Sequence, residues 1–480
     1  MTKEEILVLC KYNPEAIVEI ILNFQKQIEE LKSEIKELKE QLAKDSHNSN
    51  KPSSTDNFFK KKTNTKSLRK SSNNKTGGQK NHKGHNLKIV ENPNKTIIHK
   101  VCNCKHCGEL LNQEKIVKVE KCQVFDIAPI EVIVTEHQSE IKICSKCGKI
   151  NKANFPEEVR NVVQYGERIK TLISYFSVYQ LIPLKRLKEI FRDVFNCKIS
   201  EGTIVNTNNY ISNRLSSVEE EIKKELIKSP VVNFDETGFR AEKKLNWVHS
   251  ASTEDLTYYY FHNRRGKEAM DEMGILPFYK GIAEHDHWKA YFNYSCNHAL
   301  CNVHHLRELT FIFEEYNQDW AKEMLDLLLE INEEVEKVKL KGKTRLNHKT
   351  IKNFENRYME KIKEGFNKNP PCDKNIEIKR GRKKKSKPLN LLERLRDFIK
   401  ETLGFLHNFK IPFGNNLAER DIRMIKVKLK ISGNVRSKQG AITFCRIRSY
   451  ISTAEKRGLN ILNAISSALN NKPMIIFNKV

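Results

Sequence analysis

The chain has 480 residues, 38% hydrophobic and 30% charged, with a formal net charge of +26. This length allows about three domains with at least one large core, which excludes a small disulfide-stabilised scaffold. The charge favours a polyanionic partner, nucleic acid first, because no amphipathic anchor or lipidation motif points to a membrane. The sequence has no signal peptide and no apolar run long enough to span a membrane, so we expect a cytoplasmic, nucleoid-associated protein.

Residues 1–45 are expected to form a helix that pairs with another copy of the chain. Apolar residues recur there at the spacings of a coiled-coil seam, with Glu and Lys around them: Ile21, Phe24, Ile28, Leu31, Ile35, Leu38 and Leu42. The run covers only about three heptads, so an amphipathic helix packed on its own domain is the alternative. We expect a homo-oligomer, two-stranded in the simplest case.

Residues 46–95 are rich in Ser, Asn and Lys and poor in apolar side chains. Such a segment cannot bury enough apolar surface to offset the entropy lost on ordering, so we expect a flexible linker. Its positive charge suits the phosphate backbone of DNA, where binding weakens as salt rises. A solvated linker that binds nothing is the alternative.

Residues 96–152 carry the spacing of a zinc-binding ribbon. Cys104 and Cys107 form one Cys-x-x-Cys pair, Cys144 and Cys147 form a second, and a glycine follows each pair directly. Twelve cysteines in a cytoplasmic chain are better explained as thiols or metal ligands than as disulfides. Four thiolates on two tight turns satisfy tetrahedral Zn²⁺ without an open position, so a structural ion is predicted. Cys102 is a spare thiol beside this set.

Residues 153–228 have helical periods. A break at Asn196 separates two helical runs, and Ser200 is a suitable N-cap for the second run. This pattern predicts a helix-turn-helix whose second helix reads DNA. Generic packing of two helices is equally consistent with it.

Residues 229–440 combine strand and helix signals. Three strand-like runs, a short helix near 267–273 and two more strand-like runs predict a mixed sheet with helices packed on it. Helical periods return over about 310–405, which predicts an all-helical insertion with an exposed basic loop. Whether that loop contacts DNA or is only solvated is open. A further helix follows Gly414, and residues 441–480 are expected to be helical.

The helix after Gly414 has two distinct faces. Ala418, Ile422, Ile425 and Leu429 follow an apolar stripe, and Glu419 is the single acid on an otherwise basic face with Arg423, Lys426 and Lys430. Taken alone, this face fits an ordinary surface pair between Glu419 and Arg423, four residues apart. If the stripe packs on the sheet, Glu419 instead turns toward the strand ends.

Two further acids make the second interpretation chemically useful. Asp235 ends one apolar strand and Asp286 ends another, and ligands gather at strand ends in open α/β sheets. Carboxylate oxygens suit Mg²⁺ or Mn²⁺, and two such ions can activate a hydroxyl and stabilise the leaving oxygen of a phosphodiester. Spacing alone does not distinguish this triad from chance among sixty acidic residues.

A cluster of metal-binding residue types follows the second acid. It consists of Cys296, His298, Cys301, His304 and His305. A second metal site is one interpretation, and a group of buried or DNA-proximal side chains beside the acids is the other.

Several motifs together resemble the insertion-sequence-66 family of bacterial transposases. The likeness covers nearly the whole chain and includes the paired cysteines, "SLRKSSNNKTGGQKNHKGH", "VQYGERIKTLISYFSVYQLIPLKRL", "DETGFR", "HDHWKAY", "HALCNVHHLREL" and "NNLAERDIR". The resemblance implies a multidomain α/β fold. Its DDE-type catalytic domain would have an RNase H-like mixed sheet with an all-helical insertion, preceded by a coiled coil and a zinc ribbon.

The resemblance also implies roles for individual residues. Asp235, Asp286 and Glu419 would be the catalytic acids that bind two Mg²⁺ or Mn²⁺ ions, beside one structural Zn²⁺ on the paired cysteines. Four basic residues would line the DNA track: Arg420, Arg423, Lys426 and Lys430.

The function implied is a DNA transposase that binds element ends and catalyses strand cleavage and transfer by phosphodiester transesterification. Its partners would be double-stranded DNA at the element ends and the target, and the element's small accessory proteins. A non-catalytic zinc-ribbon DNA-binding protein or a domesticated transposase is the main alternative. A free-standing nuclease of the same fold, which hydrolyses without joining, is the second.

Overall fold

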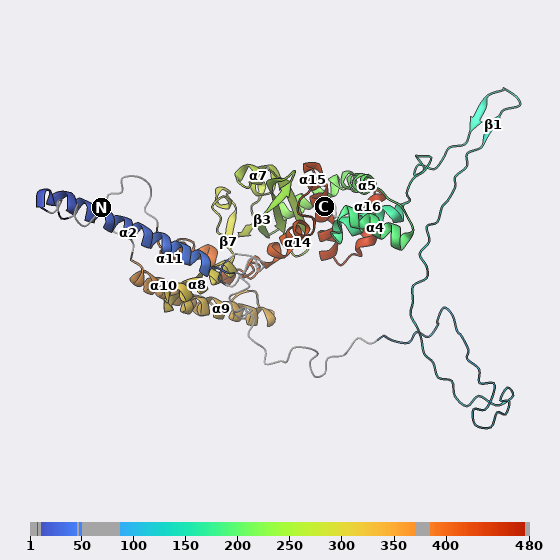
Figure 1. Ribbon diagram of the computed structural model, residues 1–480, viewed down its shortest axis with the longest axis horizontal. Coiled ribbons are helices and arrows are strands. Elements are labelled where there is room, and N and C mark those ends of the chain that lie inside the picture. The colour runs from blue at the N-terminus through green and yellow to red at the C-terminus, as the bar shows by residue number, and fades with distance from the viewer. Residues whose placement is uncertain (1–6, 8–10, 46–47, 50–86, 371–384, 476–480) are drawn as a thin grey trace.

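The computed structural model describes residues 7, 11–45, 48–49, 87–370 and 385–475. Most of the predicted basic linker (46–95) and most of the predicted basic loop of the insertion lie outside these residues. The described chain is a mixed α/β structure with a helix near the N-terminus, as predicted (Figure 1). None of the helices in these ranges is both long and apolar enough to cross a membrane.

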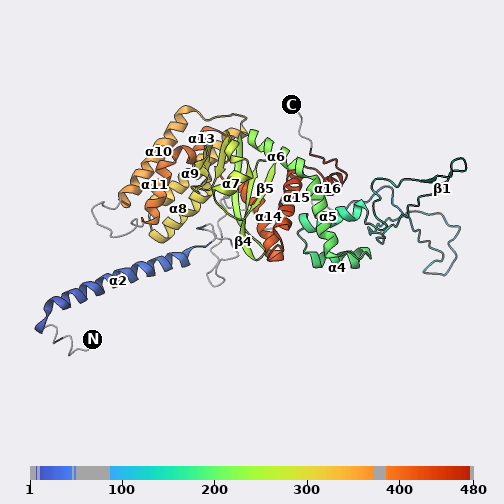
Figure 2. The ribbon, with the colours of Figure 1, turned by 90° about the horizontal axis from the view of Figure 1, so that it is seen from above.

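The C-terminal end of the helix α2 (Pro14–Ala43) meets the helical insertion, and the rest of the helix runs away from it (Figure 1 and Figure 2). Asn13 caps it by accepting a hydrogen bond from the Ala16 amide, and Pro14 at the first position suits a helix start. Near the other end, Glu40 pairs with Lys387 at 2.6 Å and accepts a hydrogen bond from the Tyr316 hydroxyl. The predicted coiled-coil seam stays exposed along the helix, so its pairing with another helix remains a prediction.

Residues 87–160 are mostly extended and contain one short antiparallel ladder of β1 (Ile141–Ile143) and β2 (Ile150–Lys152). A helical group follows, with α3 (Glu167–Ser174), a π-helical turn (Tyr175–Tyr179), α4 (Leu184–Phe195), α5 (Glu201–Arg214) and α6 (Ser216–Lys228). Asn196 has a φ of +47° and turns the chain between α4 and α5. Ser200 caps α5 as predicted, accepting a hydrogen bond from the Thr203 amide at 3.0 Å. Its role in reading DNA stays a prediction.

The mixed sheet predicted for the central region is present. Its five strands lie in the order β5-β4-β3-β6-β7. The first three are antiparallel neighbours, and β6 and β7 continue from β3 in parallel. Their bounds are β3 (Val231–Ala241), β4 (Lys244–Ser252), β5 (Thr257–His262), β6 (Ile282–His285) and β7 (Asn297–Leu300), with α7 (Lys267–Met273) before β6.

The strand that carries Asp235 is longer than its sequence predicts. The expectation that Asp235 ends the strand is wrong, because β3 continues to Ala241 as a hairpin arm with β4. The parallel pairing with β6 does stop earlier, at the pair Asn233 and Glu284. Asp235 therefore lies just past the end of the parallel ladder, although it is in the middle of its own strand.

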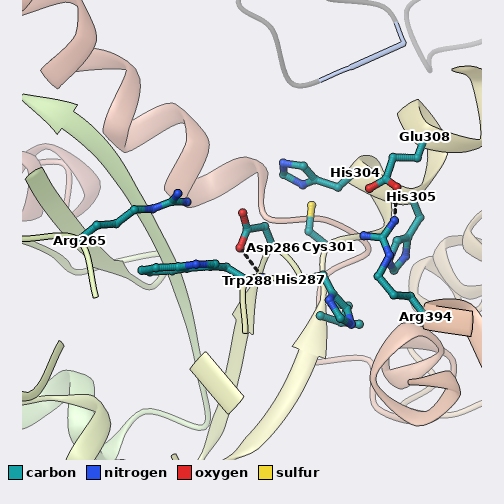
Figure 3. Close-up of a pocket in the computed structure, with 10 residues that line it drawn as sticks. Arg265, Asp286, His287, Trp288, Cys301, His304, His305, Glu308 and Arg394 are labelled. Atoms are coloured by element: carbon teal, nitrogen blue, oxygen red, sulfur yellow. Dashed lines mark hydrogen bonds and ion pairs between the residues drawn. The ribbon is translucent and has the colours of Figure 1, made fainter. Parts of the chain in front are cut away.

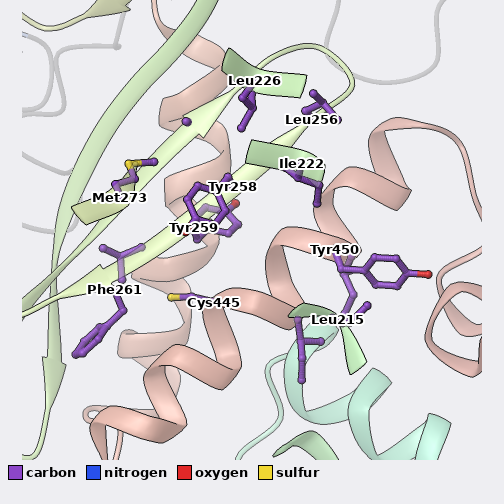
Figure 4. Close-up of a cluster of buried hydrophobic side chains, with 14 of the residues drawn as sticks. Leu215, Ile222, Leu226, Leu256, Tyr258, Tyr259, Phe261, Met273, Cys445 and Tyr450 are labelled. Atoms are coloured by element: carbon purple, nitrogen blue, oxygen red, sulfur yellow. The ribbon is translucent and has the colours of Figure 1, made fainter. Parts of the chain in front are cut away.

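Helices lie on either side of the sheet (Figure 2): α14 (Asn416–Ser432) and α15 (Lys438–Lys456) pack on β3, β4 and β5, and the insertion packs on β7. The insertion contains α8 (Asn302–Tyr316), α9 (Asp319–Leu340), α10 (His348–Lys368), α11 (Lys387–Asp397), α12 (Ile399–Thr402) and α13 (Gly404–His407), followed by α14, α15 and α16 (Ile461–Leu469). The insertion has its own apolar core around Trp320 and Tyr358. A second core joins the sheet to α6 and α15 and includes Ile222, Tyr259 and Cys445 (Figure 4).

The position of α14 is fixed by its buried face. Ala418, Ile422 and Ile425 are each at most 1% exposed, and the helix packs on β3 and β4. On the same helix Asp421 is buried and accepts hydrogen bonds from Ser252, Thr257 and Lys456. Both the apolar stripe and this buried carboxylate hold α14 against the sheet, as the stripe predicts.

Candidate active site

Asp235 lies on β3, and Asp286 follows directly after the parallel neighbour β6. The register pairs Asn233 with Glu284, so each acid lies two residues beyond one member of this pair. The two carboxylates lie near each other, since the charge of Asp286 contributes to the raised pKa of Asp235. The Trp288 amide donates a hydrogen bond to Asp286 at 3.0 Å, which fixes this carboxylate in the turn after β6.

A buried polar network under the acids connects the strands to the start of α14. The Asn233 side-chain amide donates to Glu284 at 2.9 Å and to the Asn415 side-chain oxygen at 3.0 Å. The Asn415 side chain donates in turn to the Phe234 carbonyl at 2.7 Å. Asn415 lies one helical turn before Glu419. The network thus fixes the start of the helix that carries the third acid against the strand that carries the first.

The Asn415 backbone amide extends this network to β7, because it donates to the Cys301 sulfur at 3.0 Å. Cys301 follows β7 and is the N-cap of α8. Gly414 allows this close approach, since a Cβ there would lie 2.5 Å from a Val303 methyl group. The loop before α14 is therefore clamped between β3 and the start of α8.

A pocket of about 210 Å³ opens beside Asp286. Figure 3 shows Asp286, Cys301 and His304 around it, with Glu308 and Arg394 on the side of the insertion. Glu419 reaches the same group of residues, since its carboxylate lies 3.9 Å from His304 Nε2 and 3.8 Å from an Arg307 nitrogen. The pocket thus lies between the turn after β6, the start of α8 and α11, and Glu419 borders it through His304 without lining it.

The sequence suggested Arg423 as the partner of Glu419, and the structure gives other partners. The charged contacts of Glu419 with described residues are those to His304 and Arg307, while Arg423 is exposed. Burial lowers the pKa of His304 to about 4, so the imidazole is neutral at pH 7 and its contact with Glu419 is not an ion pair. One oxygen of Glu419, Oε1, is buried and has no hydrogen-bond partner among the described residues.

The electrostatics of the acids suit a divalent cation. Burial, with added repulsion from Glu236 and Asp286, raises the pKa of Asp235 to about 8. Burial, followed by repulsion from Glu236, raises the pKa of Asp286 to about 6. Crowded, desolvated carboxylates are costly without a counter-charge, and hard divalent cations prefer such oxygen ligands. No group of close metal ligands among the described residues combines Asp235 and Asp286 with Glu419, so a shared Mg²⁺ or Mn²⁺ site on these three acids stays a prediction.

Glu236 has a different role from its neighbour Asp235. Its side chain is only 2% exposed, pairs with Arg265 at 2.6 Å and accepts a hydrogen bond from the Tyr291 hydroxyl. Arg265 also packs over the rings of Trp288 and Trp247, at 4.2 and 5.0 Å. Because these partners use both oxygens of Glu236, it is a structural acid, although it lies close enough to Asp235 and Asp286 to raise the pKa of both.

The four predicted DNA-binding residues are all exposed on α14. Arg423, Lys426 and Lys430 repeat the helical period of Glu419, and Lys426 lies near enough to Asp235 to oppose the rise in its pKa. Arg420 is turned by about 100° from Glu419 and lies near Lys456. Three of the four thus share the face of the third acid, and Arg420 borders it.

The two cysteine pairs form matching turns. In each turn the amide of the following glycine donates to the carbonyl of the first cysteine, and Gly108 and Gly148 have φ of +82° and +70°. The backbone amides of the second cysteine and of the residue before it lower the pKa of the Cys104 and Cys144 thiols. Both turns are suited to a metal ion, but no group of metal ligands among the described residues combines the two pairs. The zinc ribbon stays a prediction.

The Cys/His cluster at 296–305 divides into two groups. Cys296 is buried in the sheet core, and the ring of His298 lies 3.1 Å from His285, whose own ring stacks on Tyr291. Cys301 and His304 instead line the pocket with Asp286.

The buried network is the part of the site that sequence reasoning missed. Asn233 and Glu284 each lie two residues before a predicted acid, on the same face of their strands. The available signal was a polar residue within an otherwise apolar strand run. Burial raises the pKa of Glu284 to about 8, so this carboxyl is mainly neutral at pH 7. Asn415 carried no comparable signal, because its burial depends on the tertiary contact with β3.

Comparisons with known proteins give one informative match. A family model described as transposase IS66 family matches residues 162–443, more than half of the chain and all of the region that forms the site. A family of unknown function matches residues 9–88. No curated protein matches.

Proposed function

The chain belongs to the IS66 family of transposases, and we propose on this basis that it binds the ends of its insertion sequence and cuts and joins DNA there. The reaction would be a metal-dependent phosphodiester transesterification at Asp235, Asp286 and Glu419. The observation that carries this proposal is the buried network that connects β3, β6 and the start of α14. It gives all three acids a common support.

The three acids would hold the ions, and the basic residues of α14 would hold the DNA. Asp235 on β3 and Asp286 just after β6 would bind a shared cation between them, and Glu419 would supply its unpartnered Oε1 from the helix. A pair of divalent cations, when bound, supplies the activation of the attacking oxygen and the stabilisation of the leaving oxygen. Arg423, Lys426 and Lys430, with Arg420 at the border, would position phosphates along α14.

The remaining parts of the chain would pair the subunits and hold the DNA for the reaction. An RNase H-like arrangement of the catalytic domain (229–440, with the insertion at about 310–405) is supported by the strand order and the long antiparallel β3–β4 arm. The segment 1–45 would pair subunits as a coiled coil, the linker 46–95 and the helical domain 153–228 would contact DNA, and the ribbon 96–152 would hold Zn²⁺. The segment 441–480 would pack on the catalytic domain.

The test separates catalysis from binding. Asp235→Asn, Asp286→Asn and Glu419→Gln should each abolish Mg²⁺- or Mn²⁺-dependent cleavage of element-end DNA and leave end binding in a gel-shift assay intact. A matched control is Glu308→Gln, a pocket carboxylate whose partner is Arg394. It should keep its rate within about tenfold of wild type, since it is not a proposed ligand.

The outcomes also distinguish the alternatives. Cleavage that survives Glu419→Gln would remove Glu419 from the triad. End binding without cleavage in the wild type would support a non-catalytic DNA-binding protein, and hydrolysis without joined products from a pre-cleaved end would support a nuclease.

A further inference from the structure

Cys301, His304 and Glu419 lie together at the edge of the pocket. One ligand atom from each of the three lies within 4.8 Å of the other two. Cys301 is the N-cap of α8 and His304 lies in its first turn, so the Cys-x-x-His spacing puts both residues at one helix end. Glu419 comes from the first turn of α14. Figure 3 shows the Cys301 sulfur and the His304 ring converging on the same side of the pocket as Asp286.

Two of these three residues carry polar atoms without a partner. Glu419 Oε1 and His304 Nδ1 are buried and make no hydrogen bond with the described residues. Such orphaned atoms are uncommon in folded proteins and often mark an ion or a functional group. Glu419 Oε1 is also the oxygen that faces His304 Nε2, at 3.9 Å. The orphaned oxygen therefore lies inside the cluster.

The surroundings of Cys301 suit a thiolate ligand. Its sulfur accepts a hydrogen bond from the Asn415 amide at 3.0 Å, and the His304 backbone amide also favours the thiolate. Burial raises the pKa of this thiol to about 12, so an ion would have to displace the proton. The imidazole of His304 needs no such step, because it is neutral at pH 7.

We propose that Cys301, His304 and Glu419 form a binding site for a borderline-soft divalent ion of the Zn²⁺ type, separate from the predicted zinc ribbon. Thiolate, imidazole and carboxylate are all Zn²⁺ ligands, and Mg²⁺ does not take the first two. In a tetrahedral site these atoms lie about 3.3 to 3.6 Å apart, so His304 and Glu419, now 3.9 Å apart, would move closer on binding. The fourth position faces the pocket, near Asp286.

A Zn²⁺ ion held here would occupy the third acid of the proposed active site. This consequence rests on the proposed function, whereas the binding itself does not. Zn²⁺ bound to Glu419 Oε1 would compete with a catalytic Mg²⁺ for this carboxylate. The site would therefore act as an inhibitory zinc site, in which a soft ion withdraws Glu419 from catalysis.

Cobalt binding to the full-length chain tests the site directly. Co²⁺ reports a thiolate ligand through its near-ultraviolet charge-transfer band, and the paired cysteines contribute equally to every variant. Compared with wild type, Cys301→Ala and His304→Gln should each weaken one Co²⁺ site by about 100-fold or more, since losing a ligand costs at least as much as losing an outer-shell partner. The matched control is Cys296→Ala, a buried cysteine 6% exposed and outside the cluster, which should bind as wild type does.

Equal Co²⁺ stoichiometry and band intensity in wild type and Cys301→Ala would overturn the proposal. So would an equal loss in Cys296→Ala, since the effect would then be one of folding. For the inhibitory role, the cleavage rate of each variant is compared with and without Zn²⁺, each against its own zinc-free rate. Wild type should be inhibited and Cys301→Ala should not, while an absence of cleavage in every sample would count against the proposed function and leave the cobalt result to decide the site.

Discussion

Asn415 offers a sharp test of how the acids are brought together. Asn415→Ala keeps the backbone bond to Cys301 and removes two side-chain hydrogen bonds, at 2.7 and 3.0 Å. The Phe234 carbonyl and one Asn233 N–H are then left buried without a partner. Each such loss costs about 1–3 kcal/mol, so the free energy of unfolding should fall by about 2–6 kcal/mol. The lower end is expected, because Asn233 keeps its bond to Glu284.

The effect on chemistry should exceed the effect on stability. The start of α14 would lose its tie to β3, and a displacement of Glu419 by about 1 Å can cost about 100-fold in rate. We expect a loss of that size in single-turnover cleavage of element-end DNA at saturating Mn²⁺, with urea unfolding measured in parallel. End binding should change little, because Arg423 and Lys426 remain on the helix.

Asn246→Ala is the matched control. Asn246 is 3% exposed and its side chain also donates two hydrogen bonds, to the Ala241 and Lys244 carbonyls in the β3–β4 hairpin. Its replacement should lower stability by a similar amount and leave the cleavage rate near that of wild type. If the two variants cleave at the same rate, the network does not position Glu419, and the reasoning fails.

Three further predictions follow from other parts of the structure. Replacing Arg423 or Lys426 by alanine should weaken binding to all DNA sequences alike and reduce the salt slope of the affinity by about one per residue. Fluorescence anisotropy over a salt series measures this slope. An unchanged slope would place this face away from the phosphates. The pKa of Asp235 is raised to about 8, so its contribution to the stability of the metal-free protein is present at low pH and is lost as pH rises from about 4 to 8. Because Mn²⁺ binds the deprotonated carboxylate, Mn²⁺ affinity should rise over the upper part of that range. Calorimetric titration should show this rise flattened in Asp235→Asn, and an equal pH dependence in both proteins would contradict the assignment. Finally, Leu31→Glu in the exposed seam of α2 should reduce the molar mass measured by light scattering to that of a monomer, whereas an unchanged mass would mean that α2 does not pair subunits.

Local patterns predicted the elements well where one physical signal dominated. The apolar stripe of α14 gave the helix and its buried face, and the cap at Ser200 gave the start of α5. The end of the strand at Asp235 was predicted wrongly, because "ETGF" does not show whether a strand continues as a hairpin arm with β4. That information lies in the pairing and not in the strand itself.

Contacts between distant segments were the part that the sequence could not supply. Glu419 and Arg423 have the spacing of a helical pair, yet Glu419 contacts His304 and Arg307, more than one hundred residues earlier. The spacing of residues along a helix predicts contacts only between residues of that helix. Asp235 and Asp286 lie near each other, although Asp235 does not end its strand as predicted. The hydrogen bonds through Asn415 depend on how the insertion returns the chain to the sheet.

The attachment of α2 to the insertion also sets a distance. The helix has 30 residues, about 45 Å of rigid rod, and it is fixed near one end, where Glu40 meets Lys387 and Tyr316. If two α2 helices paired in parallel, both catalytic domains would lie at the same end of the pair and their pockets would be close together. If they paired antiparallel, the domains would be separated by roughly a rod length. The direction of pairing would therefore decide how far apart two element ends are held before they are cut.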